Sequence, residues 1–511
     1  MRFHSDLSME CMGDHMGKEY ILAVDQSTSG TKTMVVDSKG EILAKSAKGH
    51  AQYYPESGWV EHDPMEIYEN VKLLLKDVVS KCSVSPVDLD VLAVTNQRET
   101  VVIWDKTTGV PVYNAIVWLC RRTADFCGEL KNKGFESMIK EKTGLIIDPY
   151  FSASKIRWIL DHVPGAREKA ARGELLFGNI DSWLIWKLTG GKSHTTDFSN
   201  ASRTMLFNIK TLQWDKELLE LFGIPVSMLP QVRCSDEIFG QTKAGELFDE
   251  SLPIAGVIGD SQGALFGQQC FEVGMAKATY GTGSFILMNT GKHCMDSRNG
   301  LVTTIAWGVQ GEVSYAFEGI VHCTGDTLKW LKENLGMFRD FSEMEEMMNA
   351  VSDNGNVYVV PAFSGLGIPY WDAYARAAIV GMSRGSNKNH IVRAAVESIA
   401  YQVKDAVEVV QTESAIKLKE LRADGGPTTN RFLMQFQADL LDVKIAKSEV
   451  AELSAMGACY LAGLAVGIWK SVDEIKQFRK AAAVYTPNMD AQRREKYYAG
   501  WKDAVSRVLT K

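Results

Sequence analysis

Apolar and polar residues near the start of the chain form two short runs on either side of a loop of small residues. Residues 20–25 (YILAVD) and 33–37 (TMVVD) are rich in β-branched and apolar side chains, and both end in aspartate. Runs of this length predict two strands of a meander and not a strand followed by a helix. A turn at 38–40 leads into a third predicted strand at 41–44. Further strands are predicted at 91–94, 101–104 and 115–118, with helices at 66–79 and 168–172 and a strand and helix within 176–187.

The second half of the chain repeats this pattern in outline. Residues 276–279 and 285–289 have the character of strands, and the loop YGTGS (280–284) lies between them. One such loop alone is a plain hairpin turn. Two halves that each open with strand, small-residue loop and strand predict a duplicated α/β scaffold with a cleft between the halves.

Helical periodicity is clearest later in the chain. Residues 392–411 place apolar side chains at helical spacing, which predicts an amphipathic helix packed on the core. A predicted strand at 420–424 runs into Gly425-Gly426-Pro427 and then a helix at 431–441. Paired glycines between a strand and a helix let the backbone approach a nucleotide base or ribose closely.

Composition places the chain among soluble globular proteins. Its 511 residues suggest two large domains or three small ones, and 45% apolar and 23% charged residues are ordinary values. Lys and Arg number 56 against 63 Asp and Glu, a net charge of −7 without a basic block. We therefore expect neither nucleic acid nor an anionic membrane as a partner, although a basic pocket can still hold a nucleotide.

Cysteine usage and apolar runs indicate a cytoplasmic protein. The nine cysteines are scattered without CxxC spacing, as in reduced thiols and not as in a disulfide framework or a zinc site. The longest apolar run, 455–469, has 15 residues, too few to cross a membrane, and is interpreted as a buried helix. Residues 1–17 contain no secretory signal and are expected to be a disordered extension.

Common catalytic motifs are absent, but two acidic loops remain as candidates. The sequence has no GxxxxGK[ST], GxGxxG after a suitable strand, HExxH or GxSxG. The loops DQSTSGTK (25–32) and GDSQG (259–263) each place an aspartate at the end of a strand. Backbone N–H groups in such turns bind phosphates, one carboxylate can hold hydrated Mg²⁺, and the other can accept a proton from an attacking hydroxyl.

At these residues the chain resembles the FGGY family of carbohydrate kinases. The resemblance extends from about residue 20 to 501 in the family order, and it includes both family signatures, 150–162 and 377–397. The matching segments include TNQRETVVIWDKTTG (95–109), YNAIVWLCRRTAD (113–125), RGELLFGNIDSWLIWKLTGG (172–191), TYGTGSFILMNTG (279–291) and ADGGPTTNRFLMQFQADLL (423–441).

The resemblance implies a fold and a domain division. The expected fold is two actin-like or hexokinase-like (ribonuclease H-like) α/β domains with an interdomain cleft. Residues 18–267 would form the N-terminal domain with the polyol site and catalytic carboxylate. Residues 268–511 would form the C-terminal domain with the nucleotide site.

The family motifs also imply a polyol pocket and a general base. Asp260 would take the proton from a terminal hydroxyl. Polar groups would bond the hydroxyls, while Trp118 and Phe285, which by themselves would be core residues, would cover the carbon edge. The implied substrate-binding residues are Arg98, Glu99, Trp118, Tyr150, Asp260, Ser261 and Phe285.

The nucleotide and metal residues are implied in the same way. The cofactors would be ATP and Mg²⁺, with Asp25 at the metal position, acting through water. Lys329 taken alone is typical of a solvated helix lysine. The implied nucleotide-binding residues are Thr28, Ser29, Lys32, Gly281, Thr282, Gly325, Lys329, Gly426 and Asn430.

Two departures from the family pattern bear on specificity. Members that act on glycerol have Asp-Gln-Gln where this chain has Asp260-Ser261-Gln262. The first glutamine contacts a hydroxyl, and losing that bond would cost roughly 0.5–1.5 kcal/mol. Lys32 replaces an arginine that reaches the phosphates, which keeps the charge but loses the bidentate fork.

The expected activity is ATP-dependent phosphorylation of a terminal hydroxyl of a small polyol, with glycerol to sn-glycerol 3-phosphate as the first choice. A kinase for another small polyol or ketose (erythritol, threitol, dihydroxyacetone or a pentulose) stays open because of Ser261. A non-catalytic, nucleotide-gated binding protein is a more distant alternative. By analogy with the family we expect a homodimer or homotetramer.

Overall fold

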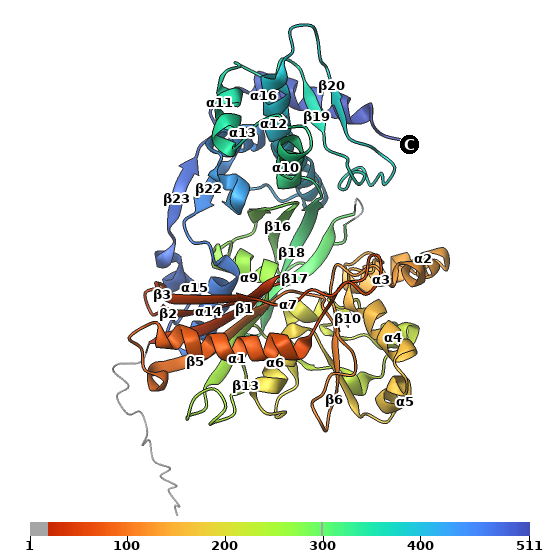
Figure 1. Ribbon diagram of the computed structural model, residues 1–511, viewed down its shortest axis with the longest axis vertical. Coiled ribbons are helices and arrows are strands. Elements are labelled where there is room, and N and C mark those ends of the chain that lie inside the picture. The colour runs from red at the N-terminus through yellow and green to blue at the C-terminus, as the bar shows by residue number, and fades with distance from the viewer. Residues whose placement is uncertain (1–18, 298–299, 511) are drawn as a thin grey trace, which may run out of the picture.

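The protein consists of two α/β halves stacked on each other, as the computed structural model in Figure 1 shows. The structure describes residues 19–297 and 300–510, so the expected extension at 1–17 lies outside the described residues. One half is built on a six-stranded sheet of order β13-β14-β5-β1-β2-β3. The other is built on a seven-stranded sheet of order β17-β18-β16-β15-β21-β22-β23.

The first sheet begins with the predicted meander. β1, β2 and β3 are antiparallel neighbours, β5 pairs with β1 in parallel, and β14 pairs with β5 in parallel. The strands are β1 (Tyr20–Gln26), β2 (Gly30–Asp37), β3 (Ile42–Gly49), β5 (Leu89–Asn96), β13 (Ile238–Gln241) and β14 (Pro253–Gly259). The hairpin is tighter than the sequence suggested, because Gln26 pairs directly with Thr31 and the loop shrinks to residues 27–29.

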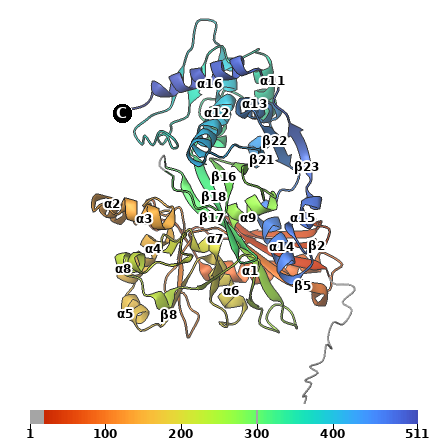
Figure 2. The ribbon, with the colours of Figure 1, turned by 180° about the vertical axis from the view of Figure 1, so that it is seen from behind.

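Both faces of this sheet are covered by helices. Leu22 and Val24 pack towards α1 (Pro64–Ser80), whereas Ile21 and Ala23 belong to the core built with α14 (Leu453–Val466). Successive strand residues point to opposite faces, so both sets are buried. The helix α14, which comes late in the chain, packs against β14, β5 and β1, and Figures 1 and 2 both place it against the first sheet. The predicted buried helix at 455–469 is thus confirmed as a layer of the first half.

The second sheet repeats the topology. β15 and β16 form a hairpin, β18 pairs with β16, β21 pairs with β15 in parallel, and β22 pairs with β21 in parallel. The strands are β15 (Met275–Tyr280), β16 (Ser284–Gly291), β17 (Val302–Val309), β18 (Glu312–Val321), β21 (Glu420–Asp424), β22 (Lys444–Ser448) and β23 (Ala481–Tyr485). The predicted duplication of strand, loop and strand is confirmed.

Helices complete the second half and an insertion widens the first. The long amphipathic helix predicted at 392–411 is α12 (Lys388–Ser414), and it packs with α13 (Arg431–Leu441) on the second sheet. The insertion between β5 and β13 contains α2 (Ala124–Asn132), α3 (Glu136–Thr143), α4 (Ser152–His162), α5 (Ala166–Ala171), α6 (Ile180–Leu188), α7 (Phe198–Ala201) and α8 (Lys216–Phe222). Within residues 19–297 and 300–510, the helices are all too short or too polar to cross a membrane.

Candidate active site

The carboxyl ends of three neighbouring strands meet at one edge of the first sheet. Gln26 of β1 and Gly259 of β14 both lie opposite Asn96 of β5. Because parallel strands end on the same side of a sheet, the residues that follow them converge. The register therefore brings the predicted residues of three distant segments to one place, with Asp25 at the end of β1, Arg98 and Glu99 after β5, and Asp260 after β14.

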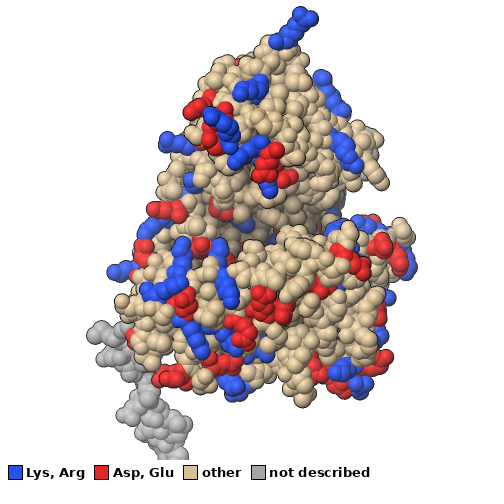
Figure 3. Space-filling view, viewed as in Figure 1, with Lys and Arg blue, Asp and Glu red and all other residues tan. Residues whose placement is uncertain are grey.

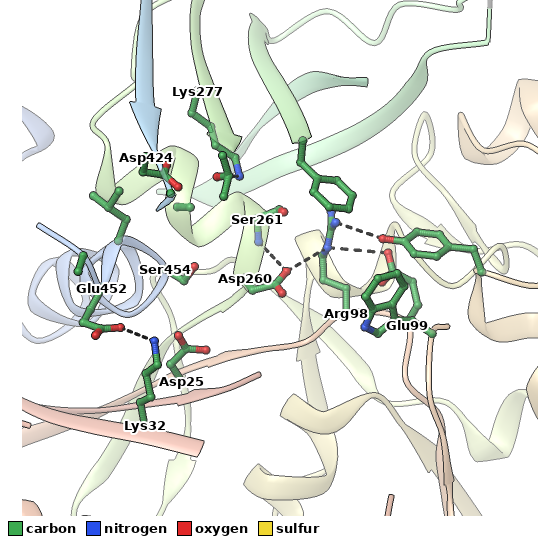
Figure 4. Close-up of a pocket in the computed structure, with 18 residues that line it drawn as sticks. Asp25, Lys32, Arg98, Glu99, Asp260, Ser261, Lys277, Asp424, Glu452 and Ser454 are labelled. Carbon is green, nitrogen blue, oxygen red and sulfur yellow. Dashed lines mark hydrogen bonds and ion pairs between the residues drawn. The ribbon is translucent and has the colours of Figure 1, made fainter. Parts of the chain in front are cut away.

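These residues open into a cavity of about 390 Å³ between the two halves. Figure 3 shows the surface hollowed between the halves, and Figure 4 shows the cavity residues. Nine predicted residues line it: Asp25, Lys32, Arg98, Glu99, Trp118, Tyr150, Asp260, Ser261 and Phe285. The lining also contains Lys277, Thr279, Asp424, Gly425 and residues 451–454, which lead into α14.

Arg98 is the centre of a buried polar network. Its Nε lies 3.2 Å from Asp260 Oδ1, its Nη1 lies 2.9 Å from Glu318 Oε2, and its Nη2 donates to the Tyr150 hydroxyl at 3.4 Å. The Arg98 side chain is only 3% exposed, whereas that of Asp260 is 37% exposed and faces the cavity. The backbone N–H of Ser261 donates to Asp260 Oδ1 at 2.6 Å. The arrangement holds one carboxylate oxygen of Asp260 and presents the carboxyl group to whatever enters.

Glu99 and Glu318 share a second arginine. Arg203 Nε donates to Glu99 Oε1 at 2.6 Å, and Arg203 Nη1 lies 3.1 Å from Glu318 Oε2. Burial raises the pKa of Glu99, against the charges of Arg98 and Arg203. Burial acts in the same direction on Glu318, but Arg203 and Arg98 bring the pKa of its carboxyl down to about 2. Glu99 has a φ of 63°, a left-handed conformation that is uncommon outside glycine and often found at functional sites.

Aromatic rings supply the apolar part of the cavity. Trp118 donates its indole N–H to Thr28 Oγ1 at 2.8 Å, and its ring meets Tyr150 edge to face at a centroid distance of 5.3 Å. Phe285, on β16, lines the cavity from the second half. Trp118 and Phe285 therefore line the cavity, and their side chains do not belong to the buried core.

Asp25 is a buried carboxylate of the cavity with an unused oxygen. Its Oδ1 has no hydrogen-bond partner among the described residues. Burial, together with the charges of Asp260 and Glu452, raises the pKa of Asp25 to about 7, although Lys32 acts in the opposite direction. The described residues contain no group of three His, Cys, Asp or Glu side chains that could hold an ion by themselves. A single carboxylate whose oxygen has no hydrogen-bond partner can bind a hydrated Mg²⁺, because this ion keeps most of its own water molecules.

Lys32 lies beside Asp25 but binds another carboxylate. Its Nζ lies 2.8 Å from Glu452 Oε2, and Figure 4 shows this pair at the edge of the cavity. Glu452 lies directly before α14, so the contact joins β2 to the helix on its sheet. The lysine thus reaches the cavity with its charge already partnered.

The predicted glycine loops of the second half lie together next to the cavity. Gly325, the first residue of α10 (Gly325–Glu333), donates its N–H to Gly281 O at 2.9 Å, and Thr324 N–H donates to Thr282 O at 2.9 Å. A Cβ at Gly325 would lie 2.5 Å from Gly281 O, so a side chain is excluded there. Gly425, just before Gly426, has a φ of 96° and packs on Tyr280.

Several predicted nucleotide residues do not line this cavity. They are Thr28, Ser29, Gly281, Thr282, Gly325, Lys329, Gly426 and Asn430. The Lys329 side chain is 67% exposed, and its Nζ lies 3.9 Å from Glu333 Oε2. Asn430 caps α13 by accepting the Leu433 N–H at 2.9 Å, while its buried Nδ2 has no partner among the described residues. Their roles towards a nucleotide stay predictions.

Five charged residues of this region were not foreseen: Arg203, Lys277, Glu318, Asp424 and Glu452. The sequence does contain a signal for Lys277, because a lysine within a predicted buried, apolar strand needs a polar partner. Its Nζ donates to Thr279 Oγ1 at 2.9 Å, and burial lowers the pKa of its ammonium group. Arg203 and Glu318 lie more than 100 residues from the charged residues they contact, so no local pattern could reveal them.

Comparison with solved structures defines the class of protein. Two sheets of matching topology around an interdomain cavity are the architecture of the actin-like sugar kinases. The chain superposes on Plasmodium falciparum glycerol kinase with ADP with a TM-score of 0.92 at 40% identity, covering 96% of this chain and 98% of that one. A ligand-bound xylulose kinase from Lactobacillus acidophilus has the same fold, with a TM-score of 0.86 at 23% identity over 95% and 98% of the two chains.

Sequence comparison gives the family. Family models for the N- and C-terminal domains of the FGGY carbohydrate kinases match residues 20–267 and 276–466. The glycerol kinase of Alkaliphilus metalliredigens is 53% identical over 492 residues, covering 96% of this chain and 98% of the relative. That of Caldanaerobacter subterraneus is 54% identical over 491 residues, covering 96% and 99%. The chain belongs to the FGGY family of carbohydrate kinases, which confirms the resemblance and the expected fold.

Proposed function

We propose that the protein transfers the γ-phosphoryl group of ATP to a terminal hydroxyl of glycerol, giving sn-glycerol 3-phosphate. The relatives named glycerol kinase, and the ADP present in the Plasmodium structure, support this choice. The observation that carries the proposal is the carboxylate of Asp260, which faces the interdomain cavity while Arg98 holds one of its oxygens at 3.2 Å. A held but accessible carboxylate is what a general base for an alcohol requires.

The polyol would bind between the polar network and the aromatic rings. Arg98 donates to hydroxyl oxygens, Glu99 accepts from a hydroxyl, and the Tyr150 hydroxyl does either. Trp118 and Phe285 cover the carbon edge of the substrate. Ser261 lies next to Asp260 and completes the set of substrate residues.

Asp260 would then act as the base of the transfer. It orients the terminal hydroxyl and accepts its proton as the oxygen attacks the γ-phosphorus, and ADP leaves with the electrons of the broken P–O bond. Enclosure of the site between the two halves keeps out water, which would otherwise be phosphorylated instead.

The second half and the β1–β2 turn would hold the nucleotide. Thr28, Ser29, Lys32, Gly281 and Thr282 are the proposed phosphate residues. Gly325, Lys329, Gly426 and Asn430 are the proposed residues for the rest of ATP, with Asn430 offering its unpartnered Nδ2. Asp25 would hold Mg²⁺ through water, and the bound ion would supply positive charge to the phosphate oxygens.

A coupled assay for ADP release tests the proposal. We expect turnover with ATP, Mg²⁺ and glycerol, and a loss of about 10²–10⁴-fold in kcat for Asp260→Asn, with ATP binding retained. An Asp260→Asn enzyme with the kcat of the wild type would overturn the assignment of the base. Asp25→Asn should raise the Mg²⁺ concentration needed for half-maximal rate.

One observation favours a second substrate class. Ser261 lines the cavity, and its hydroxyl makes no hydrogen bond among the described residues. A short, unpartnered side chain leaves space for water or for an extra hydroxymethyl group. A tetritol, dihydroxyacetone or a pentulose is therefore the alternative substrate, and the same assay with these compounds decides between them.

We also propose that the chain divides into domains at residues 18–267 and 268–511, that it forms a homodimer or homotetramer, and that it is located in the cytoplasm. The eight cysteines of the described residues are all free, which suits a reducing compartment. Light scattering after gel filtration measures the oligomeric state.

A further inference from the structure

We propose that Glu318 is a positioning residue of the polyol site, which fixes the guanidinium of Arg98 from the opposite half of the molecule. The inference rests on the proposed function, because it concerns how the same site binds its polyol. Glu318 does not line the cavity and so touches no substrate there. It acts through Arg98, which does line it.

Glu318 is anchored firmly in the second sheet. It lies in the middle of β18, opposite Leu287 of β16 on one side and Val302 of β17 on the other. Its side chain is fully buried. A residue held by two strand neighbours has little freedom to follow Arg98 if the two halves shift, so its carboxylate is a fixed reference point for the site.

The guanidinium of Arg98 contacts residues from both halves of the molecule. Glu318 Oε2 lies 2.9 Å from Nη1 and Oε1 lies 3.4 Å from Nη2, while Asp260 Oδ1 lies 3.2 Å from Nε. A planar guanidinium bound by a two-oxygen acceptor has one allowed orientation. Gln262 Oε1 also accepts from Nη1, at 3.2 Å. With Glu318 bound to both Nη atoms, the contacts of Nε to Asp260 and of Nη2 to Tyr150 lie at the cavity, which both residues line and where polyol hydroxyls would bind.

Arg203 makes the arrangement stable. Two arginines, Arg98 and Arg203, lie against two buried glutamates, Glu99 and Glu318, so the four formal charges cancel. Glu318 carries contacts to both arginines, at 2.9 Å to Arg98 and 3.1 Å to Arg203. The low pKa of its carboxyl, about 2, is consistent with an anion that stays charged throughout the working range of pH.

A purely structural ion pair and a positioning residue predict different kinetics. If Glu318 only stabilises the fold, its loss lowers the melting temperature and the amount of active enzyme, and the KM values of the surviving enzyme stay unchanged. If it positions Arg98, the KM for polyol rises while the KM for ATP does not, because the proposed phosphate residues lie on other loops. The KM split is therefore the decisive readout.

The experiment compares Glu318→Gln with Glu312→Gln. Glu312 lies on the same strand, but its side chain is 64% exposed and pairs with Lys292 at the surface, so its variant controls for the substitution. We expect Glu318→Gln to raise the KM for glycerol at least tenfold, with the KM for ATP within twofold of the wild type. Glu312→Gln should match the wild type. Glycerol binding measured by isothermal titration calorimetry should weaken by a matching factor in Glu318→Gln and not in Glu312→Gln.

Two further results keep the test decisive. If Glu318→Gln does not fold, Glu318→Asp keeps the charge and withdraws the carboxylate by one methylene, and we expect it to raise the glycerol KM by about threefold or more. Unchanged glycerol KM in a folded variant at position 318 would overturn the proposal. A wild-type enzyme that turns over no polyol in the panel would instead refute the proposed function, so the two failures are separate.

Discussion

Gly457 of α14 packs directly against Gly263 of α9 (Asp260–Gly267). A Cβ at position 457 would lie 2.0 Å from the Gly263 carbonyl oxygen, well inside any real contact distance. A Cβ at Gly267 would likewise lie 2.1 Å from Leu453 O. Glycines on both helices therefore permit the close approach of α14 to α9, and α9 begins with Asp260. Through this contact the late segment of the chain sets the position of the proposed base.

Gly457→Ala should destabilise the protein. The methyl group meets backbone on a facing helix, which cannot rotate away, so the helices must separate. We expect a loss of about 1–3 kcal/mol in the free energy of unfolding, the usual cost of overpacking, together with reduced turnover. Denaturant unfolding followed by circular dichroism measures it.

Gly128→Ala is the matched control. Gly128 lies in α2, and a Cβ there would meet no atom within 4 Å. The same substitution should be neutral or stabilising by about 0.5–1 kcal/mol. Equal destabilisation by both substitutions would mean that the α9–α14 contact is not the cause.

Lys32→Met should weaken ATP binding. Lys32 lines the cavity beside Asp25, and we propose that it moves from Glu452 to the phosphates. We expect a rise of about tenfold to a hundredfold in the KM for ATP, since one hydrogen bond to a charged group contributes roughly 1.5–3 kcal/mol. Steady-state kinetics at saturating glycerol measure the KM.

Lys45→Met is the control that shows whether the effect at Lys32 comes from its place in the cavity or from its ion pair with Glu452. The Nζ of Lys45 also approaches Glu452, at 3.9 Å, but its side chain does not line the active-site cavity. We expect no change in the KM for ATP. A rise equal to that of Lys32→Met would show that Glu452, and not the phosphates, is the functional partner of Lys32.

Ser261→Gln should narrow the choice of substrate. A longer amide would fill the space beside Asp260 and could bond a glycerol hydroxyl, which is worth roughly 0.5–1.5 kcal/mol, or up to about tenfold in KM. The wild type should accept tetritols or ketoses, and the variant should lose them while its KM for glycerol falls. A wild type whose kcat/KM for glycerol exceeds that for every tetritol and ketose by a hundredfold would remove the idea.

Asp181 should make stability fall as pH rises towards 7. It lies in the first turn of α6, fully buried, and accepts from Thr196 Oγ1 at 2.6 Å. Burial, with the charge of Asp197, raises the pKa of Asp181 to about 7, whereas its ordinary value is 3.8. Between these values the folded state holds a proton that the unfolded chain has lost, so this contribution is present at low pH and is lost above pH 7.

Asp181→Asn removes that titration. The wild type loses stability between pH 5 and pH 8 through Asp181, and the variant does not. The stability of the variant relative to the wild type should therefore be greater at pH 8 than at pH 5. Chemical unfolding at the two pH values, with wild type and variant in parallel, measures this difference. A difference that is the same at both pH values would contradict the assignment.

Local sequence patterns were enough to predict many of the strands and helices. The meander of β1 to β3, the repeated hairpin of β15 and β16, and the helices α12 and α13 were all visible as apolar runs or helical spacing, because each pattern is decided by near neighbours. The nine cavity residues were named from motif resemblance, and the structure brings them together. Their grouping depends on the register of β1, β5 and β14, which no single motif contains.

The sequence by itself determined the elements, the duplication and the chemical groups carried by the acidic loops, since these depend on residues close together in the chain. Only the tertiary structure decided that α14 covers the first sheet, that Lys32 meets Glu452, and that Glu318 reaches Arg98. These contacts join residues hundreds of positions apart, and burial removes the water that would otherwise satisfy their charges. Such partners are selected by packing and by the need to pair buried charge, so they exist only once the two halves are in place.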